Sequence, residues 1–315
     1  MQTSAPFPWF GGKSRAAGLI WSRFGDVPNY VEPFAGSLAV LLGRPHTPGT
    51  ETVNDLDAYL VNFWRAVRAD PGAVARWADW PVTEADLLAR HRWLLARDGF
   101  RDRMRSDPDH FDAKIAGWWV WGICAWIGSG WCVRDAEQLP HLGDAGRGIN
   151  RRKLPHLGDA GRDRRAGDQP PQALTGWFVA LSDRLRDVRI ACGDWSRVCG
   201  DSVTWRHGVT AVLLDPPYTQ AEHSVTYSAG DGDVAADVRA WAVANGGNPM
   251  LRIALCGYAG EHEMPDGWVR ESWKAQGGFG SQGDGRGREN AARETIWFSP
   301  ACVGSTQGIL ELGSV

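Results

Sequence analysis

The sequence has little of what marks secreted, metal-binding or membrane proteins. Its six cysteines are scattered along 315 residues without a CxxC pair, so neither a zinc ribbon nor a disulfide scaffold is indicated. No uninterrupted apolar run approaches the ~18 residues of a membrane span, and the N-terminal residues lack the apolar core of a signal peptide. We therefore expect reduced thiols, an intracellular location, no membrane contact and no metal.

Acidic and basic residues are nearly balanced, and the formal net charge is -3. The residues from Gly146 to Arg165 are an exception, with six Arg and one Lys against two Asp. They overlap a repeated phrase, LPHLGDAGR, which occupies 139–147 and again 154–162. This region is interpreted either as a duplicated loop that binds nucleic acid or as a tandem duplication in a tolerant, solvated loop.

Tryptophan is the residue in excess, with 18 copies. Many of them gather in GWWVWGICAWIGSGW (117–131). We favour this run as the core of a helical domain. The alternative is that Trp131 and the loop around it approach DNA.

Short apolar runs, most of them β-branched, predict buried strands at 29–34, 51–55, 188–194, 210–218 and 250–258, with a final strand at 294–300. Helical patterns follow the first two, at 37–44 and 57–70. This alternation indicates a parallel α/β sheet. Ligands of such sheets gather at the carboxyl ends of strands, where Glu32, Asp55, Asp194 and Asp215 are expected.

The region from about 71 to 171 has a different composition. Residues 82–98 and 112–126 have helical patterns, whereas 128–171 is rich in Gly, Arg and Pro and predicts long loops. A second glycine-rich loop is expected at 277–290. We therefore predict a domain inserted between two sequence-separated halves of one α/β sheet.

The motif Asp215-Pro216-Pro217-Tyr218 directly follows the apolar run AVLL. Two prolines after an acid stop a helix and hold the backbone extended. On such a rim the Asp215 carboxylate and the Pro216 carbonyl can accept from one amine, while the Tyr218 ring offers a stacking face. The alternative is a proline turn that merely ends a strand.

The motif YVEPFAGS (30–37) combines a strand ending in Glu32 with small turn residues before a helix. Backbone N–H groups at such a helix start can approach a ligand's carboxylate. The turn matches neither GxxxxGK[ST] nor GxGxxG. Asp55, at the end of the next strand, either accepts from ribose hydroxyls or caps the following helix.

Five motifs occur in a characteristic order: FPWFGGK (7–13), YVEPFAGS (30–37), VNDLDAYLVNFWRAV (53–67), CGDW (192–195) and DPPY (215–218). Together they resemble the Dam-like class of S-adenosylmethionine-dependent DNA adenine methyltransferases. The resemblance covers roughly residues 7–67 and 188–300. It implies an α/β, Rossmann-like methyltransferase sheet with helices on both faces. The implied domains are a cofactor-binding half (1–70), an inserted helical and loop target-recognition domain with the repeat (71–174), and a DPPY half (175–315).

The resemblance also implies roles for individual residues. Lys13 and the glycine turn would cradle the methionine part of the cofactor S-adenosylmethionine, Asp55 would take its ribose, and Asp194 with Trp195 its adenine. The implied cofactor-binding set is Trp9, Gly12, Lys13, Glu32, Pro33, Phe34, Ala35, Gly36, Ser37, Asp55, Asp194 and Trp195. Asp215, Pro216 and Tyr218 would be the catalytic residues that hold a flipped-out adenine.

The implied partner is double-stranded DNA, methylated by a monomer or weak dimer in a bacterial or phage-infected cell, as in restriction-modification. Basic residues of the repeat region would contact phosphates, and a subset would reach guanine edges. They are Arg147, Arg151, Arg152, Lys153, Arg162, Arg164 and Arg165.

The sequence departs from the family's usual turn, PFxGSG, because Leu38 replaces the last glycine. We expect Leu38 on the first helical turn, pointing away from the cofactor, with altered packing. Three other functions stay open. They are methylation of the exocyclic amine of cytosine, a catalytically impaired DNA-binding relative, and methylation of protein or RNA.

Overall fold

The chain folds into two compact units. The computed structural model describes residues 4–9, 11–81, 83–126, 131–132, 171–217, 234–273 and 294–304. The helical unit consists of residues 1–12, 57–192 and 278–280, and the sheet unit of residues 13–56, 193–277 and 281–315. The domain boundaries expected after residues 70 and 174 stay a prediction.

Among the residues that the structure describes, the sheet unit contains six strands in the order β2-β1-β4-β5-β7-β6. β1 pairs in parallel with β2 and β4, β4 pairs in parallel with β5, and β7 runs antiparallel to both β5 and β6. The expected α/β class with a mostly parallel, Rossmann-like sheet is confirmed. The bounds are β1 (Asn29–Glu32), β2 (Thr50–Asp55), β4 (Thr210–Leu214), β5 (Leu251–Tyr258), β6 (Val269–Ser272) and β7 (Glu294–Phe298).

Burial explains why most strands were predictable and β6 was not. Every residue of β1, β4 and β7 is buried, as is typical of strands covered on both faces. β6 alternates between half-buried and exposed residues at the edge of the sheet. The runs at 29–34 and 210–218 are shorter in the structure, because Pro33 and Pro216 lack the N–H that would continue the ladder.

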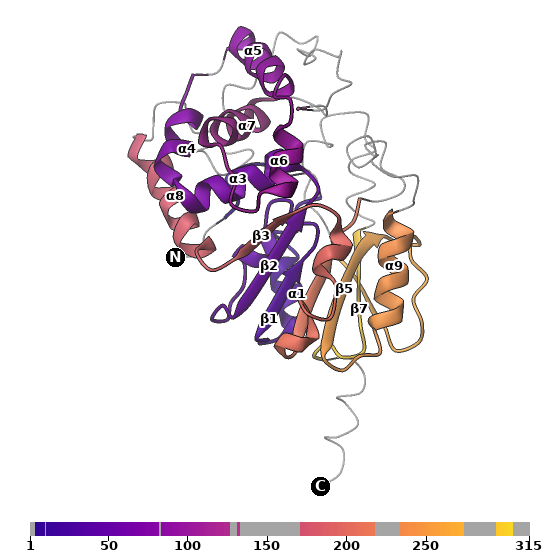
Figure 1. Ribbon diagram of the computed structural model, residues 1–315. Helices are drawn as coiled ribbons and strands as arrows, with labels where there is room; N and C mark the ends of the chain where they lie inside the picture. The colour runs from indigo at the N-terminus through magenta and orange to yellow at the C-terminus, as the bar shows by residue number, and fades with distance from the viewer. Residues whose placement is uncertain are drawn as a thin grey trace. The chain divides into compact units, whose positions relative to one another are not determined.

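The described helices of the sheet unit are α1 (Ala17–Phe24), α2 (Ala39–Leu42) and α9 (Val234–Asn245). Two short 3-10 turns, η2 (Trp195–Val198) and η3 (Trp205–His207), follow β3 in sequence. α1 buries Ile20, Trp21 and Phe24, and the Trp21 indole donates to the Val40 carbonyl at 2.7 Å. α9 lies beside β5 (Figure 1).

The helical unit consists of α3 (Ala58–Ala69), α4 (Pro71–Ala78), α5 (Glu84–Leu95), α6 (Phe100–Ser106), α7 (Ala113–Ala125), α8 (Pro171–Leu185) and the strand β3 (Arg189–Cys192). Its core is aromatic. The ring of Phe63 lies 5.4 Å from Phe7, 5.8 Å from Trp119 and 5.8 Å from Phe178, centroid to centroid. Aromatic pairs at such distances stabilise a core beyond the area that they bury.

The described residues of the tryptophan-rich run belong to the core of this unit, as favoured from the sequence. Trp119 and Trp121 are fully buried. Trp131, the residue for which an approach to DNA was considered, is also buried, and its indole donates to the Trp119 carbonyl at 3.0 Å. Gly122 of α7 makes room for it, since a Cβ there would come within 1.8 Å of the Trp131 ring.

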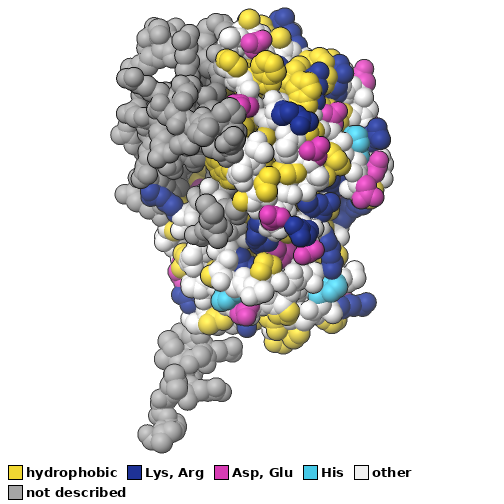
Figure 2. Space-filling view, turned by 90° about the vertical axis from the view of Figure 1, so that its left-hand side faces the viewer, with side chains coloured by type: hydrophobic (Ala, Val, Ile, Leu, Met, Phe, Trp, Pro, Cys, Tyr) yellow, Lys and Arg dark blue, Asp and Glu magenta, His cyan; other side chains and the backbone are white. Residues whose placement is uncertain are grey.

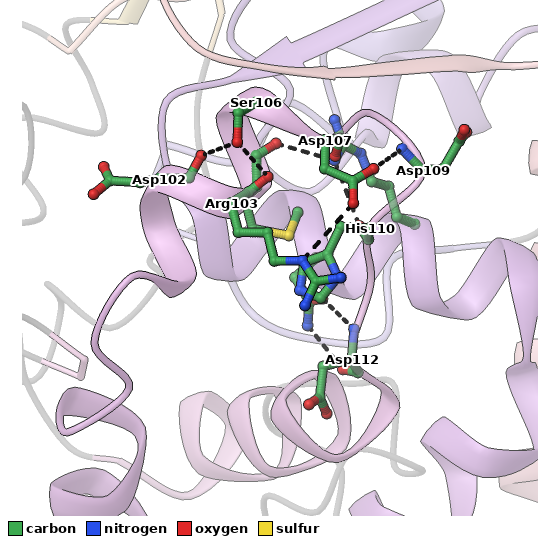
Figure 3. Close-up of polar contacts among 10 residues, drawn as sticks. Asp102, Arg103, Ser106, Asp107, Asp109, His110 and Asp112 are labelled. Carbon is green, nitrogen blue, oxygen red and sulfur yellow. Dashed lines mark hydrogen bonds and ion pairs between the residues drawn. The ribbon is translucent and has the colours of Figure 1, made fainter.

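The connection between α6 and α7 is fixed by local polar contacts (Figure 3). The Ser106 hydroxyl donates to the Asp102 carbonyl at 2.8 Å, and Arg103 pairs with Asp107 at 3.8 Å. Asp112 then caps α7 by accepting from the N–H of Lys114 at 2.8 Å. This acidic connection is therefore stabilised by helix capping and ion pairing.

Candidate active site

Three of the four acids predicted at strand ends lie where expected, and the fourth, Asp194, lies two residues beyond the end of β3. Glu32 is the last residue of β1, Asp55 is the last residue of β2, and Asp215 directly follows β4. Asp194 precedes η2. Because β2, β1 and β4 are parallel neighbours, their carboxyl ends meet at one edge of the sheet.

Lys13 lies against two carboxylates at this edge. Its Nζ is 2.9 Å from Oδ1 of Asp215 and 3.7 Å from Oε2 of Glu294, the first residue of β7. The Lys13 side chain is only 3% exposed. Burial lowers the pKa of Lys13, but the charges of Asp215 and Glu294 outweigh this effect and raise the pKa above its ordinary value. Lys13 is thus held as an ammonium ion.

Asp215 is the most accessible member of this cluster. Its side chain is 22% exposed, while Pro216 behind it is buried. The two prolines keep residues 215–217 out of regular structure directly after β4. A carboxylate is therefore presented at the sheet edge on a rigid backbone.

Glu32 lies in a fully buried position beside Tyr30. The Tyr30 hydroxyl donates to Oε2 of Glu32 at 3.0 Å. Burial raises the pKa of Glu32 to about 8, although the Tyr30 hydrogen bond acts in the opposite direction, and the nearby charge of Asp215 raises it further. Glu32 is consequently protonated at neutral pH.

The glycine turn after β1 is fixed to β2. The N–H of Ala35 donates to the Asn54 carbonyl at 2.8 Å, and the N–H of Gly36 donates to Oδ2 of Asp55 at 3.1 Å. Gly36 has a φ of 45°, a conformation that favours glycine. The alternative role of Asp55 as a helix cap is wrong, because Asp57 caps α3 through the N–H of Tyr59.

The expected position of Leu38 was wrong. It does not lie on the first turn of α2 but caps it, with φ 53° and ψ 26° in the left-handed region. The side chain is fully buried. Glycine adopts this left-handed backbone conformation without strain, whereas leucine adopts it at a cost of roughly 1–2 kcal/mol.

Aromatic rings flank the turn. Phe34 and Trp195 are both half-buried and nearly parallel, with centroids 6.2 Å apart and an interplanar angle of 25°. Asp194 is exposed, and its Oδ1 accepts from the N–H of Ser196 at 2.9 Å, which caps η2. Flat faces and carboxylates thus surround a glycine turn.

Comparison with known proteins fits this arrangement. Residues 9–84 match the family model described as D12 class N6 adenine-specific DNA methyltransferase. The matched residues include Lys13, Glu32 and Asp55. The resemblance inferred from the motifs is confirmed, and so is the class of enzyme, an adenine-specific DNA methyltransferase. A search of curated proteins gave no match.

Several residues predicted for the site belong to the helical unit or lie outside the described residues. Trp9 and Gly12 belong to the helical unit, where the Trp9 ring lies 5.9 Å from Phe7. Tyr218, the repeat LPHLGDAGR, the glycine-rich loop at 277–290 and the basic residues expected to bind DNA lie outside the described residues. Those basic residues are Arg147, Arg151, Arg152, Lys153, Arg162, Arg164 and Arg165.

Sequence reasoning missed Glu294, Tyr30 and Trp273 as neighbours of the cluster. Trp273 lies with its ring centroid 5.8 Å from Nζ of Lys13. Glu294 begins a strand, and only an antiparallel direction brings a strand's first residue to the carboxyl edge of its neighbours. Glu294 could have been predicted only if the sequence had indicated the antiparallel direction of β7.

None of the helices that the structure describes is long and apolar enough to cross a membrane. Within the same residues, no group of three or more His, Cys, Asp or Glu side chains is placed to hold a metal ion.

Proposed function

We propose that the protein transfers a methyl group from S-adenosylmethionine to the exocyclic amine of an adenine flipped out of duplex DNA. The D12 class match supports DNA adenine methylation in general. One observation supports methyl transfer to the exocyclic amine in particular. The Asp215 carboxylate, on its proline rim, already accepts from a nitrogen, Nζ of Lys13 at 2.9 Å. It is therefore oriented to accept from an amine.

Asp215 and Pro216 would act on the target amine directly. The lone pair of an adenine amine is delocalised into the ring, which makes the nitrogen a poor nucleophile. Accepting one N–H on Asp215 and the other on the Pro216 carbonyl favours a pyramidal nitrogen with a localised lone pair. The Tyr218 ring would stack on the flipped base. Much of the rate enhancement would then come from proximity and alignment.

The residues around the glycine turn suit the proposed cofactor. S-adenosylmethionine, when bound, supplies a methyl group on a positively charged sulfur. Trp195 and Phe34 offer flat, half-buried faces to an adenine ring, and Asp55 and Asp194 offer carboxylates to ribose hydroxyls and an amine. Because Glu32 is protonated at neutral pH, the ion-paired cluster of one ammonium and two carboxylates favours a cationic ligand.

DNA recognition is assigned to the repeat region. On the face drawn in Figure 2, acidic and basic side chains of the described residues are interspersed. The basic segment between Gly146 and Arg165 has a strong excess of one sign. We infer that Arg147, Arg162 and their basic neighbours bind phosphates, with a subset contacting base edges.

The test is to identify the methylated product. The protein is incubated with labelled S-adenosylmethionine and duplex DNA, and the DNA is digested to nucleosides. Label in N6-methyladenine is the expected result. Label in N4-methylcytosine would show that cytosine is the target base, and label on the protein with none in the DNA would contradict the proposal.

A further inference from the structure

Asn54, the next-to-last residue of β2, is buried at the carboxyl edge of the sheet. Its side-chain amide donates to two backbone carbonyls, that of Pro33 at 3.1 Å and that of Gly193 at 2.9 Å. Because carbonyl oxygens only accept, the nitrogen of the amide must face both of them. Asn54 thus links the glycine turn after β1 to the turn at Gly193, two segments that lie far apart in the sequence.

The main chain of β2 contacts the same two turns. The N–H of Ala35 donates to the Asn54 carbonyl at 2.8 Å, and the N–H of Gly193 donates to the Asp55 carbonyl at 3.0 Å. One hydrogen bond fixes a distance but leaves a turn able to rotate about it, whereas a second bond also restricts its orientation. The Asn54 amide supplies a further bond to each turn.

Each turn carries one of the rings proposed to contact the adenine of the cofactor. Phe34 lies between two residues of the glycine turn that contact Asn54, and Trp195 lies two residues beyond Gly193. The two rings are nearly parallel, with centroids 6.2 Å apart. A binding site of this kind requires its side chains to be held to within about 0.5 Å. The contacts of the two turns therefore decide whether both rings fit one ligand.

We propose that Asn54 is a positioning residue that fixes the two turns relative to each other and so sets the spacing of Phe34 and Trp195 for S-adenosylmethionine. This inference rests on the proposed function. Without the amide, the two turns would no longer share a buried donor. The glycine turn would keep its contact between the Gly36 N–H and Asp55. The turn at Gly193 is therefore the one that loss of the amide would release most.

Asn29 offers a matched control in the same unit. It is the first residue of β1, and its buried side-chain amide donates to the carbonyls of Val203 at 2.8 Å and Thr204 at 3.1 Å. Among the residues that the structure describes, the Oδ1 atoms of Asn29 and Asn54 both lack a hydrogen-bond partner. Asn29→Ala and Asn54→Ala therefore remove the same kind of contact, and both should lower the melting temperature.

The experiment measures binding of S-adenosylmethionine and of adenosine by calorimetry, well below the melting temperature of each variant. We expect Asn54→Ala to bind both ligands about 10-fold more weakly than wild type, because the ring spacing is lost. Asn29→Ala should bind them as wild type does. In methylation assays, Asn54→Ala should raise KM for S-adenosylmethionine by a similar factor and leave KM for DNA unchanged. Asn54→Ser, which keeps one donor, should show a smaller loss and replaces Asn54→Ala if that variant does not fold.

Wild-type affinities in a folded Asn54 variant would overturn the inference. An equal loss in Asn29→Ala would do so too, because it would indicate a general effect of lower stability. A loss for S-adenosylmethionine without a loss for adenosine would show that Asn54 does not set the ring spacing.

Failure of the proposed function gives a different result. If wild type binds S-adenosylmethionine but transfers no methyl group to DNA, the proposed function fails, and the binding comparison still decides the role of Asn54. If wild type binds no S-adenosylmethionine, the inference is wrong.

Discussion

At Leu38 the backbone conformation favours glycine, but the packing around the side chain favours a large residue. The left-handed conformation, with φ 53°, favours glycine, whereas the fully buried side chain fills space that glycine would leave empty. The strain is roughly 1–2 kcal/mol. A buried leucine cut back to alanine costs about 2–5 kcal/mol. Packing therefore outweighs strain.

We expect both Leu38→Gly and Leu38→Ala to lower the free energy of unfolding, but glycine to be the less damaging change. Both remove nearly the same volume, and only glycine also relieves the strained backbone, by about 1 kcal/mol. Chemical denaturation of both variants gives the comparison. Alanine equal to or better than glycine would show that the left-handed conformation carries no cost.

Glu32 should make the stability of the protein depend on pH. Burial raises its pKa from 4.5 to about 8, so between these values the folded state binds a proton that the unfolded state has released. Its contribution to stability falls as pH rises from about 4.5 to about 8. Glu32→Gln, which mimics the protonated form, should remove this part of the dependence. Melting curves at pH 5 to 9 test this, and parallel curves for both proteins would contradict it.

The sequence predicted Glu32, Asp55 and Asp215 at the sheet edge because each closes an apolar run of a parallel strand. It could not predict Glu294, whose place depends on the antiparallel direction of β7. The ion pairs of Lys13 were equally hidden, since they join residues more than two hundred positions apart in the chain. Long-range partners of this kind leave no local pattern.

Among the elements, α7 shows how a helix can depend on a missing side chain. Gly122 costs helix propensity, yet a Cβ there would lie 1.8 Å from the Trp131 ring. Gly176, in α8, has no atom within 4 Å of its hypothetical Cβ. Gly122 is therefore required by packing, whereas Gly176 is not, so the two helical glycines can be compared directly.

We expect Gly122→Ala to destabilise the protein by about 1–3 kcal/mol, because Trp131 must shift. Gly176→Ala should stabilise it by about 0.5–1 kcal/mol through helix propensity. Thermal melts of the two variants measure both effects. An increase in stability for Gly122→Ala would show that Trp131 does not occupy this space.

Element prediction succeeded where burial was continuous and failed at the surface. The runs that became β4 and β7 are wholly buried and were predicted. β6 is a short edge strand with alternating exposure, and its four residues carry too weak a pattern to separate from a loop. Strand ends were overestimated at Pro33 and Pro216, since the apolar pattern does not report the loss of a backbone donor.

At the scale of the whole molecule, three observations support the proposed function: a Rossmann-like sheet, a D12 class match over residues 9–84 and a carboxylate at the end of β4. The match ends well before Asp215. The role of Asp215 therefore rests on the geometry of the sheet edge and on the DPPY motif. This makes Asp215 the residue on which the central claim depends.

The most direct measurement is methyl transfer from labelled S-adenosylmethionine to duplex DNA by wild type, Asp215→Ala and Asp201→Ala. Lys13 keeps Glu294 as a partner in Asp215→Ala, so the variant should fold. We expect it to lose activity by about 100- to 1,000-fold, while the exposed Asp201 variant keeps wild-type activity. Equal rates for wild type and a folded Asp215→Ala would contradict the account.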